Sequence, residues 1–477
     1  MTVKSRQEAS VGTGQEGTAI PLAGESAKAG RFGFARRPML PWIDTGQGNI
    51  LSWLIPWIRK GGFALLDQGL ISGSNFVISI LLARWLVPDQ YGSYAVAFGV
   101  LVLVVLVYQS LVLEPMAVFG ASSYRASLRN YLHSVLRIHL LLWVPILLLL
   151  GIAVVFTRTS GQSAGLSGAL GGVMVAAPCV LLFWLARGTF YVKLSPASAA
   201  AGAAVYSSLA LAGLYVVYRK GWLSPFTAFL LMALAALATG AVLLVRLRRS
   251  LVSGGEVFAT YDIWRRHWGY GRWALASCIA GWLPAYVYYP LLSSFSGMSQ
   301  SGQLKALMNL TLPLEQAKAA MSLLLLPFAA GMYERQGETG ASSMAGKITF
   351  LTVAAGIVYW SILIPLQKPL FHLLYSNRYL EVAHLLPLVA LGSIFYSAAF
   401  GGAIVLRAMD SPGALFGAFG LATALSLLVG IPATKMFGLT GAIWGSNIAD
   451  IASLIMVLLV LRYKLAGKAK PAASFVS

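Results

Sequence analysis

Residues 61–86 read GGFALLDQGLISGSNFVISILLARWL, residues 87–94 read VPDQYGSY, and residues 95–113 read AVAFGVLVLVVLVYQSLVL. Each apolar run is about twenty residues long, which at about 1.5 Å per residue crosses a hydrocarbon core of roughly 30 Å. The connector from Val87 to Gly92 is so short that we expect a tight turn at a membrane surface. The stretch therefore predicts a hairpin of two membrane-spanning helices.

Three polar side chains in the first run share one helical face. Gln68, Ser72 and Asn75 are spaced i, i+4 and i+7. Polar groups cannot face lipid without a large cost, because the hydrocarbon offers no hydrogen-bond partner. We therefore expect this stripe to face protein or a water-filled cavity.

The composition extends this reading to the whole chain. The 477 residues are 58% hydrophobic and only 10% charged, whereas a soluble domain carries about 25% charged residues. An all-α polytopic membrane protein is the class that fits. The net charge of +20 does not predict nucleic-acid binding, because the basic residues cluster at the ends of apolar runs, as the positive-inside rule describes. Cys179 and Cys278 lie in predicted spans as small buried hydrophobes.

Hydropathy predicts about twelve transmembrane helices. The expected spans lie near residues 62–85, 92–113, 138–157, 166–186, 197–218, 224–245, 271–295, 303–330, 347–366, 383–406, 412–432 and 439–461. The polar connector 246–270, which carries five arginines, separates two groups of six. The domain boundaries that we expect are a disordered cytosolic tail (1–49), an interfacial helix (50–61), an N-terminal six-helix lobe (62–250), a C-terminal six-helix lobe (251–465) and a second cytosolic tail (466–477).

The distribution of basic residues predicts the orientation. With the N-terminus in the cytosol, most of the 35 Lys and Arg residues fall in the tails and the cytosolic loops. Both termini are therefore expected to be cytosolic. The basic residues predicted to lie on the opposite side are Arg84, Arg158, Arg219, Lys220, Lys368, Arg378 and Lys435.

The two halves also repeat each other. The sequence at 89–94 has a counterpart at 299–304, Ser195-Pro196 matches Ser411-Pro412, and the segment 219–224 matches 435–440. Copies with an even number of spans share an orientation, which predicts a pseudo-two-fold axis along the membrane normal. In transporters built on such parallel repeats, the binding site lies at the repeat interface. We therefore expect a central cavity between the two lobes.

The basic start, the Gln/Ser/Asn-bearing first span, the turn LLARWLVPDQYGSYA and the six-plus-six repeat together resemble a known family. It is the polysaccharide transporter branch of the multidrug/oligosaccharidyl-lipid/polysaccharide (MOP) exporter superfamily, over about residues 55–465. The resemblance implies a MATE-like fold in a bacterial inner membrane that flips undecaprenyl-diphosphate-linked oligosaccharides by alternating access. It also implies the lipid-linked glycan and membrane lipids as partners, with a polysaccharide polymerase and glycosyltransferases as candidates. The arginines typical of the related lipid II flippases have no match in the first two spans.

The predicted span 303–330 carries most of the candidate substrate-binding residues. Lys305, Asn309 and Gln316 lie close together on a helical wheel, and Glu315 and Lys318 are i, i+3 neighbours. Charges at membrane depth are retained only with a partner or a cavity. Lys305 and Lys318 are therefore candidates for binding a diphosphate or acidic sugar, and the alternative for Glu315 and Lys318 is a structural ion pair.

Other candidates lie outside that span. Pro313 should kink its helix. Asp67 is expected to bind a coupling cation or, preferentially, to pair with Arg272. Arginines at the predicted cytosolic helix ends suit diphosphate oxygens, since the guanidinium is a planar fork of donors, but most of them fit the role of topology determinants. The basic residues at these helix ends are Arg125, Arg129, Arg187, Lys193, Arg272 and Arg407. Of these, Arg187 and Arg272 are included in the predicted substrate-binding set, together with Gln68 and Asn75 of the first span.

The sequence predicts no enzyme, metal site or cofactor, because its five histidines lack metal-ligand spacing and no phosphate-binding glycine loop follows a strand. The leading hypothesis is a lipid-linked oligosaccharide flippase. The alternative from the same superfamily is a cation-coupled multidrug exporter, which would need acidic residues in its cavity. A membrane glycosyltransferase or polymerase would need a large polar loop, and none is predicted.

Overall fold

The described part of the chain is entirely helical. The computed structural model describes residues 50–161, 163–250, 258–409 and 412–466, and the predicted tail 1–49 and residues 467–477 of the predicted C-terminal tail lie outside these ranges. The helices of the first half are α1 (Ile50–Trp85), α2 (Pro88–Tyr108), the π-helix η1 (Gln109–Leu113), α3 (Glu114–Ala121), α4 (Leu128–Thr159), α5 (Ala164–Val192), α6 (Pro196–Arg219) and α7 (Pro225–Ser250).

The second half begins after the connector, of which residues 251–257 lie outside the described residues. Its elements are α8 (Thr260–Tyr286), α9 (Tyr288–Phe295), α10 (Met298–Asn309), α11 (Leu312–Leu363), α12 (Gln367–Tyr375), the 3₁₀ helix η2 (Leu380–Leu385), α13 (Leu386–Ala408) and α14 (Pro412–Ala466). We refer to α1–α7 as the N-lobe and to α8–α14 as the C-lobe.

Ten of the described helical stretches are long and apolar enough to cross a membrane. They account for the twelve predicted spans as follows. The last two predicted spans correspond to two helices that α14 joins across a kink at Gly438, where φ is +54°. The predicted span 303–330 is divided between α10 and α11 and is not among the ten.

Local structure differs from the sequence prediction at two turns. Pro88 begins α2, so Asp89 to Gly92 form its first turn and the predicted six-residue connector is wrong. Proline suits the first helical turn because its missing N–H would have no partner there. For the same reason Pro313 lies in the first turn of α11 rather than in mid-helix, and the chain breaks before it, at Leu310 and Thr311. Helix α1 also runs unbroken through the predicted junction at residues 61 and 62.

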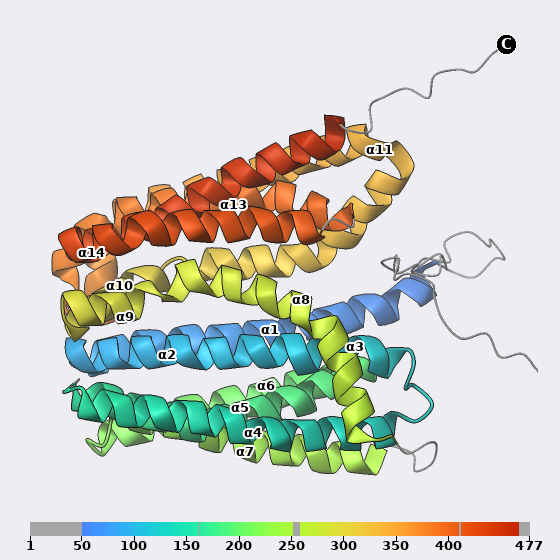
Figure 1. Cartoon of the computed structure of the whole chain (residues 1–477), viewed down its shortest axis with the longest axis horizontal. Coiled ribbons are helices and arrows are strands. Elements are labelled where there is room, and N and C mark those ends of the chain that lie inside the picture. Colours follow the sequence, from blue (N-terminus) through green and yellow to red (C-terminus); the bar gives the residue numbers. More distant parts are fainter. Residues whose placement is uncertain (1–49, 162, 251–257, 410–411, 467–477) are drawn as a thin grey trace, which may run out of the picture. The chain divides into compact units, whose positions relative to one another are not determined.

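The lobes are built from sequential helices, and the described residues from Leu54 onward form one compact unit. In the N-lobe α5 contacts α2, α4, α6 and α7, and in the C-lobe α13 contacts α11 and α14. Helix α8 (yellow-green in Figure 1) connects them, since it contacts α3, α4 and η1 in the N-lobe and α14 in the C-lobe. At the crossing, a Cβ on Gly271 would lie 2.4 Å from the Ser110 carbonyl oxygen, so only glycine allows this approach.

The contact between α2 and α10 supports the predicted internal repeat. Pro88 begins α2 and Met298 begins α10, 210 positions later. A Cβ on Gly92 would meet the Met298 carbonyl oxygen, and a Cβ on Gly302 would lie 2.7 Å from the Pro88 carbonyl oxygen. These two contacts exchange equivalent positions, as a two-fold axis between the helices requires. The lobes therefore meet at the N-terminal ends of α2 and α10.

Candidate functional site

Two adjoining cavities lie towards the opposite end of the helices, near Leu65 of α1 and the C-terminal end of α5. The larger, of about 500 Å³, is lined by α1, α5, η1, α3 and α11. The smaller, of about 360 Å³, is lined by α11, α13 and α14. Gln316 and Ala319 line both, so the first turns of α11 form the partition. We call the two cavities together the chamber.

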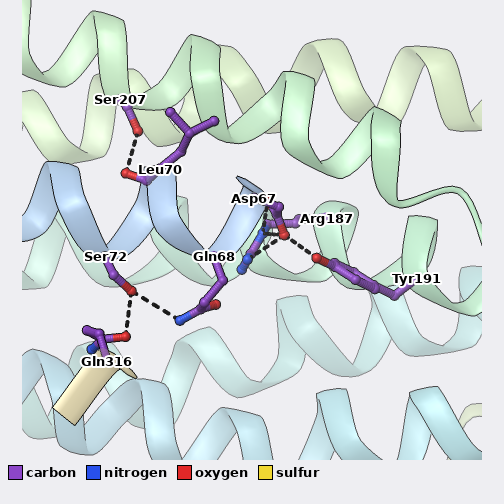
Figure 2. Close-up of polar contacts among 8 residues, drawn as sticks. All are labelled: Asp67, Gln68, Leu70, Ser72, Arg187, Tyr191, Ser207 and Gln316. Carbon is purple, nitrogen blue, oxygen red and sulfur yellow. Dashed lines mark hydrogen bonds and ion pairs between the residues drawn. The ribbon is translucent and has the colours of Figure 1, made fainter. Parts of the chain in front are cut away.

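A buried ion pair forms part of the wall of the larger cavity, to which Arg187 contributes. Arg187 on α5 donates from Nε to both carboxylate oxygens of Asp67 at 2.9 Å and from Nη2 to Oδ2 at 2.6 Å, and the Tyr191 hydroxyl donates to the same Oδ2 (Figure 2). Asp67 is 0% and Arg187 6% exposed. The predicted pairing of Asp67 with Arg272 is therefore wrong: Arg272 is exposed and lies over the Trp273 ring.

A chain of hydrogen bonds joins the lobes across the chamber. Gln68 donates to the Ser72 hydroxyl at 3.1 Å, and Ser72 donates to Oε1 of Gln316 on α11 at 2.8 Å (Figure 2). The predicted polar stripe thus faces protein and cavity through Gln68 and Ser72. Asn75, the third predicted member, is half-buried outside this network and does not line the chamber.

The smaller cavity holds the second ion pair. Lys318 donates to Glu315 Oε1 at 2.7 Å and to the Ser397 hydroxyl at 3.3 Å, and its Nζ lies 4.1 Å from the centre of the Tyr396 ring. The predicted i, i+3 pair is therefore formed. Arg407 at the end of α13 lines the same cavity and is exposed.

Lys305 and Asn309 lie outside the chamber. They are part of the contact between α2 and α10. Asn309 donates from Nδ2 to the Tyr91 hydroxyl and accepts from Ser79, both at 2.9 Å. Lys305 is 6% exposed, with Nζ 4.7 Å from the centre of the Phe98 ring. A helical wheel cannot separate these residues from Gln316, because the break at residues 310 and 311 turns α11 away from α10.

Five chamber aromatics were absent from the sequence-based candidates: Trp184, Tyr191, Tyr396, Phe400 and Phe419. The spacing of Arg187 and Tyr191, four residues apart on one helix, was the available signal. Among the described residues, no group of His, Cys, Asp and Glu side chains could hold a metal ion.

The fold is that of solved MOP superfamily transporters. An inward-facing multidrug resistance MATE family transporter aligns with a TM-score of 0.71 at 13% identity, over 85% of this chain and 96% of that chain. The lipid II flippase MurJ in an inward closed conformation aligns at 0.66 and 12%, over 86% and 87%. An outward-facing MATE family transporter aligns at 0.61 and 13%, over 86% and 96%. No protein-family model and no curated protein matches the sequence.

These likenesses establish the fold of a multi-pass membrane protein. The arrangement of the lobes shows which end of the lobe interface is closed. The chamber opens at one end and the lobes touch at the other. If the N-terminus is cytosolic, as the basic residues predict, the chamber opens to the cytosol.

Proposed function

We propose that this chain flips undecaprenyl-diphosphate-linked oligosaccharides across a bacterial inner membrane by alternating access of its two lobes, with both termini in the cytosol. The observation that carries the proposal is the chamber at the lobe interface, whose wall combines cations with amides and aromatic rings. A diphosphate bonded to a sugar needs both kinds of contact. Polysaccharide polymerase and glycosyltransferases are the proposed partners that consume and supply the glycan.

The charge of the chamber favours an anionic substrate. Two ion pairs among the described residues join Arg187 to Asp67 and Lys318 to Glu315. Arg407 belongs to neither pair, so its charge is available to the cavity. A guanidinium donates parallel hydrogen bonds to phosphate oxygens. We assign the diphosphate to the smaller cavity, beside Arg407 and Lys318.

The larger cavity suits the sugar units. Trp184 and Tyr191 contribute aromatic rings to its wall, and Gln68 and Gln316 contribute amide groups that can donate to and accept from hydroxyls. Because Gln316 lines both cavities, a single headgroup can occupy both at once.

The multidrug-exporter alternative is less well supported. A cationic drug or a coupling cation needs a carboxylate in the chamber, yet Asp67 and Glu315 are each bonded to a fixed cation. Asp450 of α14 belongs to neither pair, and it does not line either cavity. Growth of a drug-sensitised strain measures this directly: expression of the chain should leave drug tolerance unchanged, and increased tolerance would favour the alternative.

Deletion of the gene tests the proposal itself. In a strain with no second flippase, we expect lipid-linked repeat units to accumulate on the cytosolic face. Complementation with Arg407→Gln should restore about a tenth of the wild-type export or less, because a hydrogen bond to a charged group contributes about 1.5–3 kcal/mol. Arg407→Lys, which keeps the charge, should retain more. Normal surface glycan in the deletion strain would refute the proposal.

A further inference from the structure

Lys305 is a buried cation that lies against an aromatic ring. Its side chain is 6% exposed and lies over Phe98 of α2, and neither ion pair of the described residues includes it. An aromatic face returns only part of what an ammonium loses on leaving water. This arrangement of the lobes therefore holds a positive charge that an anion would stabilise.

The contact that buries Lys305 is formed between the two lobes. Lys305 lies between Gly302, where an added Cβ would meet the Pro88 carbonyl oxygen, and Asn309, which donates a hydrogen bond to Tyr91. It is about 10 Å from the beginning of α10 at a rise of about 1.5 Å per residue. We call this contact between α2 and α10 the seam. Glycine-to-carbonyl contacts do not interlock, so the seam can open without unfolding either helix.

Two arginines close the rim of the seam. Arg84 of α1 donates from Nη1 to the Leu373 carbonyl of α12 at 3.1 Å, so it reaches from the N-lobe to the C-lobe. Arg378, just before η2, donates from Nη1 to the Leu86 carbonyl at 2.6 Å, which is the reverse direction. Both acceptors are uncharged carbonyls that water can replace. The rim is therefore a reversible latch.

Lys305 also lies on the route from the chamber to the latch. Gln316 lines the chamber near the start of α11, Asn309 ends α10, and Lys305 lies one turn farther along α10 towards the rim. A headgroup that leaves the chamber between the lobes must pass it. When the seam is closed, Phe98 covers the ammonium.

We propose that Lys305 is the anion-binding residue of the opposite, outward-open state: opening of the seam exposes its ammonium, which then binds the diphosphate that the chamber cations release. The proposal rests on the flippase function proposed above. It gives the protein two cationic stations, one on each side of the gate, that are exposed alternately.

The first arm of the test asks whether the latch controls the seam. Met308, half-buried one turn from Lys305, is replaced by cysteine in a Cys179→Ala, Cys278→Ala background, and the chain is reconstituted in phosphatidylcholine vesicles. A membrane-impermeant thiol reagent is added outside. We expect Arg84→Gln with Arg378→Gln to accelerate labelling of M308C about tenfold or more. As the matched control, Ser322→Cys in the chamber should label more slowly in the same latch variant.

The second arm asks whether Lys305 binds the anion. In the latch variant, inorganic pyrophosphate should slow labelling of M308C, and Lys305→Arg should preserve this protection while Lys305→Met abolishes it. Protection that survives Lys305→Met overturns the proposal, as does M308C labelling that the latch variant leaves unchanged. These readouts need no glycan. If pyrophosphate protection fails while deletion of the gene still stops export, only the role of Lys305 is refuted. If protection is observed while the deletion strain makes normal surface glycan, only the glycan substrate is refuted.

Discussion

At the scale of single residues, the Arg187–Asp67 pair is an ion pair buried within the N-lobe. Three donor–acceptor contacts and the Tyr191 hydroxyl satisfy the Asp67 carboxylate. Removing one partner leaves the other charge buried and unpaired, which costs about 3–5 kcal/mol. We therefore expect Arg187→Met to lower the thermal unfolding midpoint of the detergent-solubilised chain markedly.

The double variant Arg187→Met, Asp67→Asn should lose less stability than Arg187→Met alone, because neither charge then remains unpaired. Arg272→Met is the matched control, since Arg272 is exposed, and its unfolding midpoint should stay at the wild-type value. Equal midpoints for Arg187→Met and Arg272→Met would contradict the pair as we describe it.

The same residues show how far the sequence determines the site. Helical spacing predicted the Glu315–Lys318 pair, because both partners lie on one helix. It placed Asp67 in an ion pair but chose Arg272, since spacing within a helix carries no information about which helices pack together. The contact to Arg187 depends on the packing of α1 against α5 over a separation of 120 residues.

At the scale of helices, the seam depends on glycine at the start of α2. A Cβ on Gly92 would lie 1.9 Å from the Met298 carbonyl oxygen, a backbone atom that cannot move without α10. Overpacking of this kind typically costs about 1–3 kcal/mol. We expect Gly92→Ala to lower the free energy of unfolding by that amount and the unfolding midpoint with it, and Gly302→Ala, at 2.7 Å, to have a smaller effect.

The control for this prediction is Gly69→Ala in α1. Nothing lies within 4 Å of a Cβ there, and alanine favours the helix. Gly69→Ala should therefore leave the midpoint unchanged or raise it slightly. If Gly92→Ala behaved in the same way, α2 and α10 could not be in contact as closely as described.

Helix boundaries were predictable only in part. The positions of apolar runs located the spans well, because length and hydropathy determine them. The break between α10 and α11 was expected at Pro313 and lies at residues 310 and 311, because proline is accepted in the first turn of α11. That shift separates Lys305 and Asn309 from Gln316 and so divides the predicted site between the seam and the chamber.

At the scale of the whole molecule, alternating access requires the two lobes to separate at the seam. Ser79 of α1 donates to Asn309 of α10 at 2.9 Å, so this pair joins the lobes. Ser74 of α1 accepts from Ser207 of α6 at 3.0 Å, and this pair lies within the N-lobe. The two pairs have similar geometry and share α1, but only the first spans the moving interface.

Cross-linking these pairs tests the motion as a whole. In the cysteine-free background, a short bifunctional thiol reagent should join Ser79→Cys to Asn309→Cys and hold the seam closed, so that export stops and recovers when the link is reduced. The same reagent on Ser74→Cys with Ser207→Cys should leave export unchanged, because the N-lobe moves as a unit. Export that persists with the first pair linked would show that the substrate does not cross through the seam, since a joined α1 and α10 leave no opening between the lobes there.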